Sequence, residues 1–304
     1  MLPTISAFAL CAFAFVAFAS GPEHKLDIVD RTPKFKAFYD QAIAQALTSN
    51  ARFGLWKKEY GYAAVPPGPE GEAMARKLLD SAWKKYPALL PRLSRLTADA
   101  KADAKYAFNR INELYKTQST PIQTRLILFV GQFDNNAFSI PAMNGKPATT
   151  VMEVDDVALR TTLAHELAHT VHFQLAHVKN GFGAPVGETM FLEGLAMRTA
   201  QQVYAGLPET VFTEMPQEKG WLKRCYANQE RVVSQIAKDL DKSGREVALK
   251  YTFGNGNTGM HREAYCAAWI VMGKLLKSGK TLADLARIPE GRMVDAMRYA
   301  LSSR

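Results

Sequence analysis

The chain has 304 residues, of which 47% are hydrophobic, and its formal net charge is +9. This length and apolar content suffice for a full buried core, so the composition excludes a disordered chain and favours a globular protein. No basic motif with interleaved aromatic residues appears, so we expect no nucleic-acid binding. The positive charge favours attraction to an anionic envelope surface or an acidic substrate.

Residues 1–19 are typical of an export signal. An almost uncharged apolar run extends from Leu10 to Ala19 and ends with Ala17-Phe18-Ala19, a small-x-small pattern that permits cleavage before Ser20. No Lys or Arg precedes the run, so an uncleaved membrane anchor remains the alternative. We expect an exported protein, periplasmic or secreted.

Removal of the signal would leave two cysteines, Cys225 and Cys266. In an oxidising compartment such a pair favours a disulfide, although two buried free thiols are the alternative. Neither cysteine belongs to a paired metal-binding spacing, so we do not expect them to bind a metal.

The next part of the chain, residues 20–118, is expected to be a helical N-terminal region. From Phe35 to Thr117 it is rich in Ala, Lys, Arg and Leu at helical spacing. The segment 65–69, Pro87 and Pro91 interrupt this pattern and indicate turns between helices. We expect no strand between Phe35 and Thr117.

Residues 119–304 begin with two short runs of strand character. The runs are 126–130 and 149–154, both rich in β-branched or aromatic residues, and a loop is expected between them. Helical spacing then returns through the C-terminus, apart from the glycine-rich break at 253–257. The pattern predicts a mostly helical α+β fold with a small sheet.

The motif His165-Glu166-Leu167-Ala168-His169 lies in the helical run that follows the second strand. Residues four apart stack on one helical face, so two imidazoles at this spacing can bind one zinc ion. Glu166 points about a quarter-turn away, where it can contact a water activated by the ion and accept its proton. The alternative is that these residues lie on a solvated helix face and bind no metal.

A catalytic zinc site normally has a third protein ligand. Glu193, in Phe191-Leu192-Glu193-Gly194-Leu195-Ala196, is our choice, because its apolar neighbours indicate an inward face and the small residues after it let its helix approach the motif helix closely. Glu188 is the competitor, but it follows loop signals and resembles a first-turn acid of a helix. His172 is interpreted as a packed or outer histidine, since a fourth protein ligand would close the site.

These residues together resemble the gluzincin group of zinc metallopeptidases, and most closely a bacterial family of predicted Zn-dependent proteases. The resemblance covers roughly the last 180 residues and includes His165-Glu166-x-x-His169, the Glu193-Gly194-Leu195-Ala196 segment and Tyr265. It implies a zincin-like catalytic domain at 119–304, whose small sheet lies beside the metal-binding helix. It also implies one zinc ion per chain held by His165, His169 and Glu193, with Glu166 as general base. Many gluzincins have an aspartate four residues after the ligand glutamate, but this chain has Met197.

The expected activity is hydrolysis of peptide bonds in a peptide or protein substrate. His261 or Tyr265, four residues apart on one helical face, could stabilise the developing oxyanion. An exposed edge strand could bind an extended substrate, with 149–154 or 125–130 as candidates, and a structural strand without substrate contact is the alternative. A zinc amidase acting on non-peptide amides and a non-catalytic envelope binding protein are the alternatives; oligomeric state is left open.

Overall fold

The computed structural model describes residues 23–61, 63, 65, 68–133, 137–155, 159–179, 181 and 183–302. The expected export signal at residues 1–19, and with it the membrane-anchor alternative, lies outside these residues. Within the described ranges, no helix combines the length and apolar character that spanning a bilayer requires.

The strands are β1 (Lys25–Asp30), β2 (Gln123–Phe129), β3 (Ala137–Ile140) and β4 (Ala148–Glu153). The helices of the first half are α1 (Thr32–Ala44), α2 (Ser49–Glu59), α3 (Pro69–Trp83), α4 (Tyr86–Leu114) and α5 (Leu159–Leu175). The helices that follow are α6 (Val186–Val203), α7 (Thr210–Thr213), α8 (Trp221–Ala227), α9 (Gln229–Ile236), α10 (Arg245–Ala248), α11 (Glu263–Lys277), α12 (Leu282–Leu285) and α13 (Met293–Ser302). The chain is therefore a mostly helical α+β protein with a small sheet, as the sequence predicts.

The sheet has the order β1-β2-β4-β3. β1, β2 and β4 are parallel, whereas β3 pairs antiparallel with β4 and forms an edge. The expected strands at 126–130 and 149–154 are the two inner strands. β1 and β3 were not expected, and the region between the inner strands, interpreted as a loop, contains β3. β3 has only four residues, and both missed strands are stabilised by pairing that a local pattern does not show.

The strand β1 belongs to the N-terminal part of the chain, so the sheet contains strands from before and after residue 118. It pairs with β2 from Lys25↔Gln123 to Asp30↔Leu128. Arg125 donates to the Asp27 carboxylate across this pair, with 2.8 Å between Nε and Oδ2. Between Phe35 and Thr117 the described residues contain helices and no strand, as expected.

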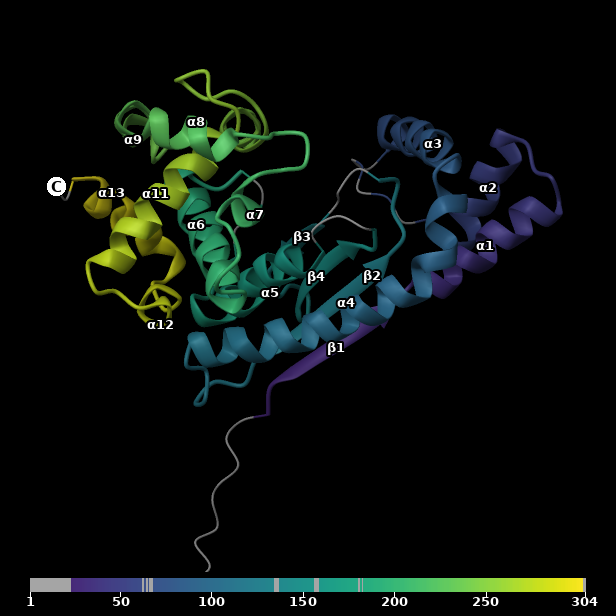
Figure 1. Ribbon diagram of the computed structural model, residues 1–304, viewed down its shortest axis with the longest axis horizontal. Coiled ribbons are helices and arrows are strands. Elements are labelled where there is room, and N and C mark those ends of the chain that lie inside the picture. Colours follow the sequence, from purple (N-terminus) through teal and green to yellow (C-terminus); the bar gives the residue numbers. More distant parts are fainter. Residues whose placement is uncertain are drawn as a thin grey trace, which may run out of the picture.

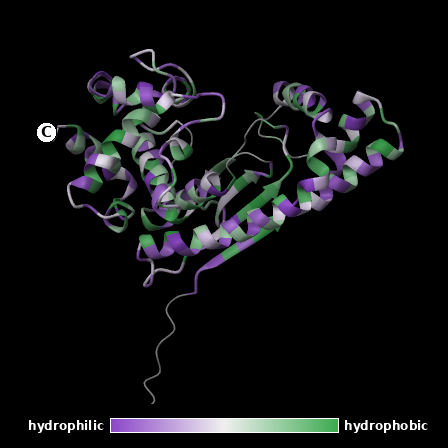
Figure 2. Ribbon diagram, viewed as in Figure 1, coloured by the Kyte–Doolittle hydropathy of each residue, from purple (hydrophilic) through white to green (hydrophobic). Residues whose placement is uncertain are grey.

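Helix α5 lies over β2, β3 and β4, and the long helix α4 runs beside α5 and along β1 (Figure 1). Helix α6 packs against α5 and also against α11 and α13. The C-terminal helices therefore gather at one end of the molecule (Figure 1). Much of β2 is coloured hydrophobic in Figure 2, and its residues Leu126 and Leu128 are fully buried. The core extends from the sheet through α5 and α6 to α11.

The helices before β2 pack on the end of that strand. The Tyr60 hydroxyl accepts a hydrogen bond from the Val130 amide at 2.7 Å and donates to the Val130 carbonyl at 3.0 Å. Tyr86 donates to the Gly131 carbonyl at 2.9 Å. These contacts fix the segment that leaves β2 toward β3.

One proline of this region differs from the expectation. Pro87 is the second residue of α4, in the first turn, where a missing amide is tolerated, but Pro91 lies inside the same helix rather than in a turn. The prediction of a turn at Pro91 is wrong. A single lost backbone bond near the start of a 29-residue helix is offset by its packing on α5.

Candidate metal centre

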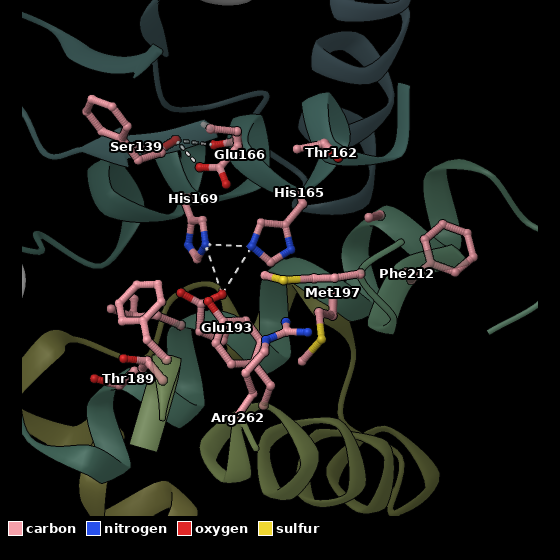
Figure 3. A pocket seen from close by; sticks show the side chains of 18 of the residues that line it. Ser139, Thr162, His165, Glu166, His169, Thr189, Glu193, Met197, Phe212 and Arg262 are labelled. Carbon is pink, nitrogen blue, oxygen red and sulfur yellow. Dashed lines mark hydrogen bonds and ion pairs between the residues drawn. The ribbon is translucent and has the colours of Figure 1, made fainter. Parts of the chain in front are cut away.

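Helix α5 carries the two histidines and the glutamate of the motif. Leu163, Leu167 and Val171 of this helix are fully buried, so its register on the sheet is fixed by the core. A polar contact supports this register, since Thr124 of β2 donates to Thr170 at 3.3 Å. The packing turns His165 and His169 toward α6 (Figure 3).

Glu193 of α6 meets the two histidines across the space between α5 and α6 (Figure 3). The Nε2 atom of His165 lies 3.1 Å from Nε2 of His169 and 3.1 Å from Oε2 of Glu193. His169 Nε2 is 3.6 Å from the same carboxylate oxygen. Among the described residues, these side chains form the one group of three or more His, Cys, Asp or Glu that could hold a metal ion.

The charges within this group favour an ionised Glu193. Burial opposes ionisation, but the charge of His169 and hydrogen bonds from both histidines outweigh it and hold the pKa of Glu193 well below its usual range. Burial by itself would lower the pKa of His169, yet the nearby Glu193 carboxylate raises it overall. The carboxylate is therefore available as an anionic ligand at neutral pH.

The competing candidates lie elsewhere. Glu188 is in the first turn of α6, as expected, and is buried outside the group of three ligand-type side chains. His172 is buried beside the ring of Phe191, with 5.8 Å between ring centroids. Burial, together with the charge of His169, lowers the pKa of His172 to about 3, so it stays neutral.

Glu166 lies beside the histidines, and its carboxylate points toward the sheet (Figure 3). Only 7% of the residue is exposed. Ser139 of β3 donates a hydrogen bond to Oε2 of Glu166 at 2.8 Å. Ser139 could not be identified from the sequence, because its contact with Glu166 depends on the pairing of β3.

Tyr265 of α11 lines the same cavity as the histidines. Burial raises the pKa of its phenol well above the usual value, and the adjacent negative charge of Glu193 raises it further. The Arg262 guanidinium lies 4.2 Å from the centroid of the Tyr265 ring. Tyr265 therefore remains a protonated hydrogen-bond donor at neutral pH.

His261 does not share a helical face with Tyr265. Helix α11 begins at Glu263, and His261 precedes it on the exposed surface. Its Nδ1 contacts the Glu218 carboxylate and its Nε2 lies 2.7 Å from the Phe253 carbonyl oxygen. Both ring nitrogens are thus engaged, and the residue is not part of the cavity wall.

The three ligand-type residues border a cavity of about 770 Å³. Strand β3 forms one wall of it, and helices α5 and α6 with the segment 211–217 form others. Met197 and Phe212 contribute apolar surface near His165 (Figure 3). The cavity therefore combines the three ligand-type side chains with an apolar lining.

Comparison with known families agrees with this arrangement. Residues 107–295 match the model of a family described as Predicted Zn-dependent protease (DUF2268). The chain belongs to this family. The match spans the helices that carry His165, His169, Glu193 and Tyr265, and it begins after α1, α2 and α3. No match to the chain was found among curated proteins or among solved structures.

A zinc ion fits the donor set that this chain presents. With metal–ligand bonds of roughly 2.0–2.2 Å, the donors of a tetrahedral zinc site lie about 3.3–3.6 Å from one another. The distances among His165, His169 and Glu193 run from 3.1 to 3.6 Å. Two imidazoles and a carboxylate are also the ligand types of catalytic rather than purely structural zinc sites.

The groups that orient the histidine rings differ from the usual gluzincin pattern. Met197, at the position of the usual aspartate, is buried in the cavity wall. Within the described residues, Nδ1 of His169 is buried and has no hydrogen-bond partner. The ring of His169 is instead stacked on Phe173, with 5.6 Å between centroids. Packing therefore orients this imidazole.

Proposed function

We propose that the chain is an exported zinc-dependent metallopeptidase that hydrolyses peptide bonds with Glu166 as general base. The observation that carries the proposal is the approach of Glu193 to both motif histidines at the wall of a large cavity, with Glu166 adjacent. On a solvated helix face without metal, nothing would bring the two histidines and Glu193 together. A structural zinc site would have no need of an acid beside its ligands.

His165, His169 and Glu193 would hold the ion, one per chain. Bound zinc would act as a Lewis acid, which polarises the scissile carbonyl and increases the acidity of water. Glu166 accepts the proton of the attacking water and delivers it to the departing amine. Proton transfer of this kind contributes roughly 10²- to 10⁴-fold to a rate.

Tyr265 is the proposed donor to the developing oxyanion. Its phenol lies against the Glu193 carboxylate and lines the cavity, so it is close to the reacting carbonyl of a bound peptide. A neutral hydroxyl aimed at developing negative charge lowers the barrier for acyl transfer. His261, the other candidate, is held on the surface and has no part in this proposal.

Strand β3 is the proposed docking edge for substrate. The two earlier candidates, 149–154 and 125–130, correspond to β4 and β2, which have paired neighbours on both sides. The expectation that one of them is an exposed edge is wrong. β3 is the edge strand beside α5 and lines the cavity, so an extended peptide can add to it by main-chain hydrogen bonds.

Export is supported by the cysteines. Cys225 of α8 and Cys266 of α11 form a disulfide, and disulfides persist in oxidising compartments. A periplasmic or secreted location follows from this and from the signal-like residues 1–19. The net charge of +9 would hold the protein near an anionic envelope surface.

The decisive experiment compares the wild type with Glu166→Gln after zinc content has been measured in both. The substitution keeps the shape of the side chain and removes the base. The proposal predicts one zinc per chain in both proteins and loss of turnover of a peptide library in the variant alone. Equal turnover in the two proteins contradicts the role of Glu166, and a zinc-loaded wild type that cleaves amides but no peptide favours the amidase alternative.

A further inference from the structure

Ser139 lies in the middle of the edge strand β3, opposite Thr150 of β4 in the antiparallel register. Its neighbours Phe138 and Ile140 are 40% and 39% exposed. Because side chains alternate along a strand, Ser139 faces the opposite side, toward α5. The strand proposed to bind substrate therefore also presents one hydroxyl to the helix of the metal centre (Figure 3).

The hydroxyl of Ser139 has three neighbours. Its Oγ is 2.8 Å from Oε2 of Glu166, 2.9 Å from the Glu166 carbonyl oxygen and 2.9 Å from Oγ1 of Thr150. Thr150 in turn lies 3.3 Å from the same carbonyl. Two hydroxyls thus share a carboxylate and a carbonyl as acceptors.

Each hydroxyl has one proton to donate. The carboxylate is the stronger acceptor, because hydrogen bonds to an ionised group are about twice as strong as neutral ones. Thr150 can donate to the Glu166 carbonyl, which frees the Ser139 proton for the carboxylate. The arrangement gives both acceptors a donor.

We propose that Ser139 is a positioning residue that holds the carboxylate of Glu166 in its working orientation. This inference rests on the proposed function. A glutamate side chain has three rotatable bonds, and a hydroxyl fixed to the sheet removes much of that freedom. With Oε2 held by Ser139, Oε1 is the oxygen assigned to proton transfer.

The position of Ser139 also links the base to substrate binding. Its backbone belongs to the strand that a peptide would join, and its side chain contacts the base directly. A peptide docked on β3 is therefore held in the same rigid frame as the Glu166 carboxylate. Misplacement of reacting groups by about 1 Å can reduce a rate 10²-fold, so such a frame matters for turnover.

The test uses the internally quenched library peptide that the full-length wild type cleaves best. Ser139→Ala should lower kcat by roughly 10- to 100-fold, the range of a hydrogen bond to a charged group, with KM within about twofold and zinc content unchanged. Ser139→Thr retains the hydroxyl and should retain most of the wild-type kcat. This split between kcat and KM separates positioning from substrate binding.

Ser49→Ala provides the matched control. Ser49 also donates to a carboxylate, that of Asp80 at 2.7 Å, but both residues belong to the N-terminal helices. Ser49→Ala should reduce the free energy of unfolding about as much as Ser139→Ala does, but without a change in kcat.

An unchanged kcat in Ser139→Ala overturns the inference and leaves the peptidase proposal standing. An increase in KM alone overturns it too, because it would make Ser139 a substrate contact. Equal loss in the Ala and Thr variants would show that volume rather than the hydroxyl matters. A zinc-loaded wild type that cleaves no peptide overturns the proposed function, and the role of Ser139 with it.

Discussion

Gly194 of α6 faces Ala268 of α11 so closely that a Cβ added to Gly194 would lie 2.8 Å from the Ala268 carbonyl oxygen. The glycine follows Glu193 directly, so the contact between the two helices sets the position of the carboxylate. From the sequence, the small residues after Glu193 are expected to let its helix approach the motif helix closely. For Gly194 this is wrong, because the space it leaves is filled by α11.

Gly194→Ala should therefore destabilise the protein and displace Glu193. Overpacking of this kind reduces the free energy of unfolding by about 1–3 kcal/mol, and we expect weaker zinc binding as well. Gly54→Ala is the control, since Gly54 lies in α2 with no atom near its added Cβ. Alanine is the better helix former there, so this control should be neutral or stabilising by up to about 1 kcal/mol.

Denaturant unfolding and zinc titration of the two glycine variants check this prediction. Equal stability of Gly194→Ala and the wild type would contradict the close contact between α6 and α11.

The disulfide between Cys225 and Cys266 should contribute substantially to stability. It closes a loop with a sequence separation of 41 residues, for which chain entropy predicts about 3–4 kcal/mol. Reduction of the wild type should lower its denaturation midpoint to that of the double variant Cys225→Ala/Cys266→Ala. Reductant should leave the denaturation midpoint of the double variant unchanged. A wild-type midpoint that is the same with and without reductant would argue against the bond.

His172 should make stability fall in mildly acidic solution. Its pKa of about 3 in the folded state lies below the ordinary value of 6.5, so the unfolded chain binds more protons between these values. The free energy of unfolding contributed by neutral His172 is therefore complete above pH 6.5 and declines as the pH falls. The expected loss between pH 7 and pH 5 is about 2 kcal/mol.

Denaturant unfolding of the metal-free wild type and of His172→Leu, each at pH 7 and pH 5, measures this effect. The variant should lose less stability than the wild type over the same interval. Identical losses in both proteins would show that His172 does not resist protonation in the folded state.

Helix α5 and the two inner strands, β2 and β4, could be predicted from local sequence, because each shows its own periodicity. The apolar neighbours of Glu193 also indicated its inward face, and the structure places it with the histidines. Fold class could therefore be predicted from the pattern of elements. The orientation of α6 depends on Gly194 and α11, which lie far apart in sequence.

The missed features depend on contacts between distant segments. β1 is held by a parallel partner nearly one hundred residues away, and β3 is only four residues long. Ser139 gains its contact with Glu166 only once β3 is paired. His261 is removed from the cavity because Arg262, in the left-handed region with φ of 55°, turns the chain just before α11.

The most direct test of the central claim is zinc binding by Glu193→Gln and Glu188→Gln, two matched substitutions five residues apart on α6. The wild type and Glu188→Gln should each contain one zinc per chain, bound with similar affinity. Glu193→Gln should bind zinc at least 10-fold more weakly, in line with the 10- to 100-fold effects that even outer-shell changes produce. Full zinc binding by Glu193→Gln, or absence of zinc from the wild type, would contradict the account.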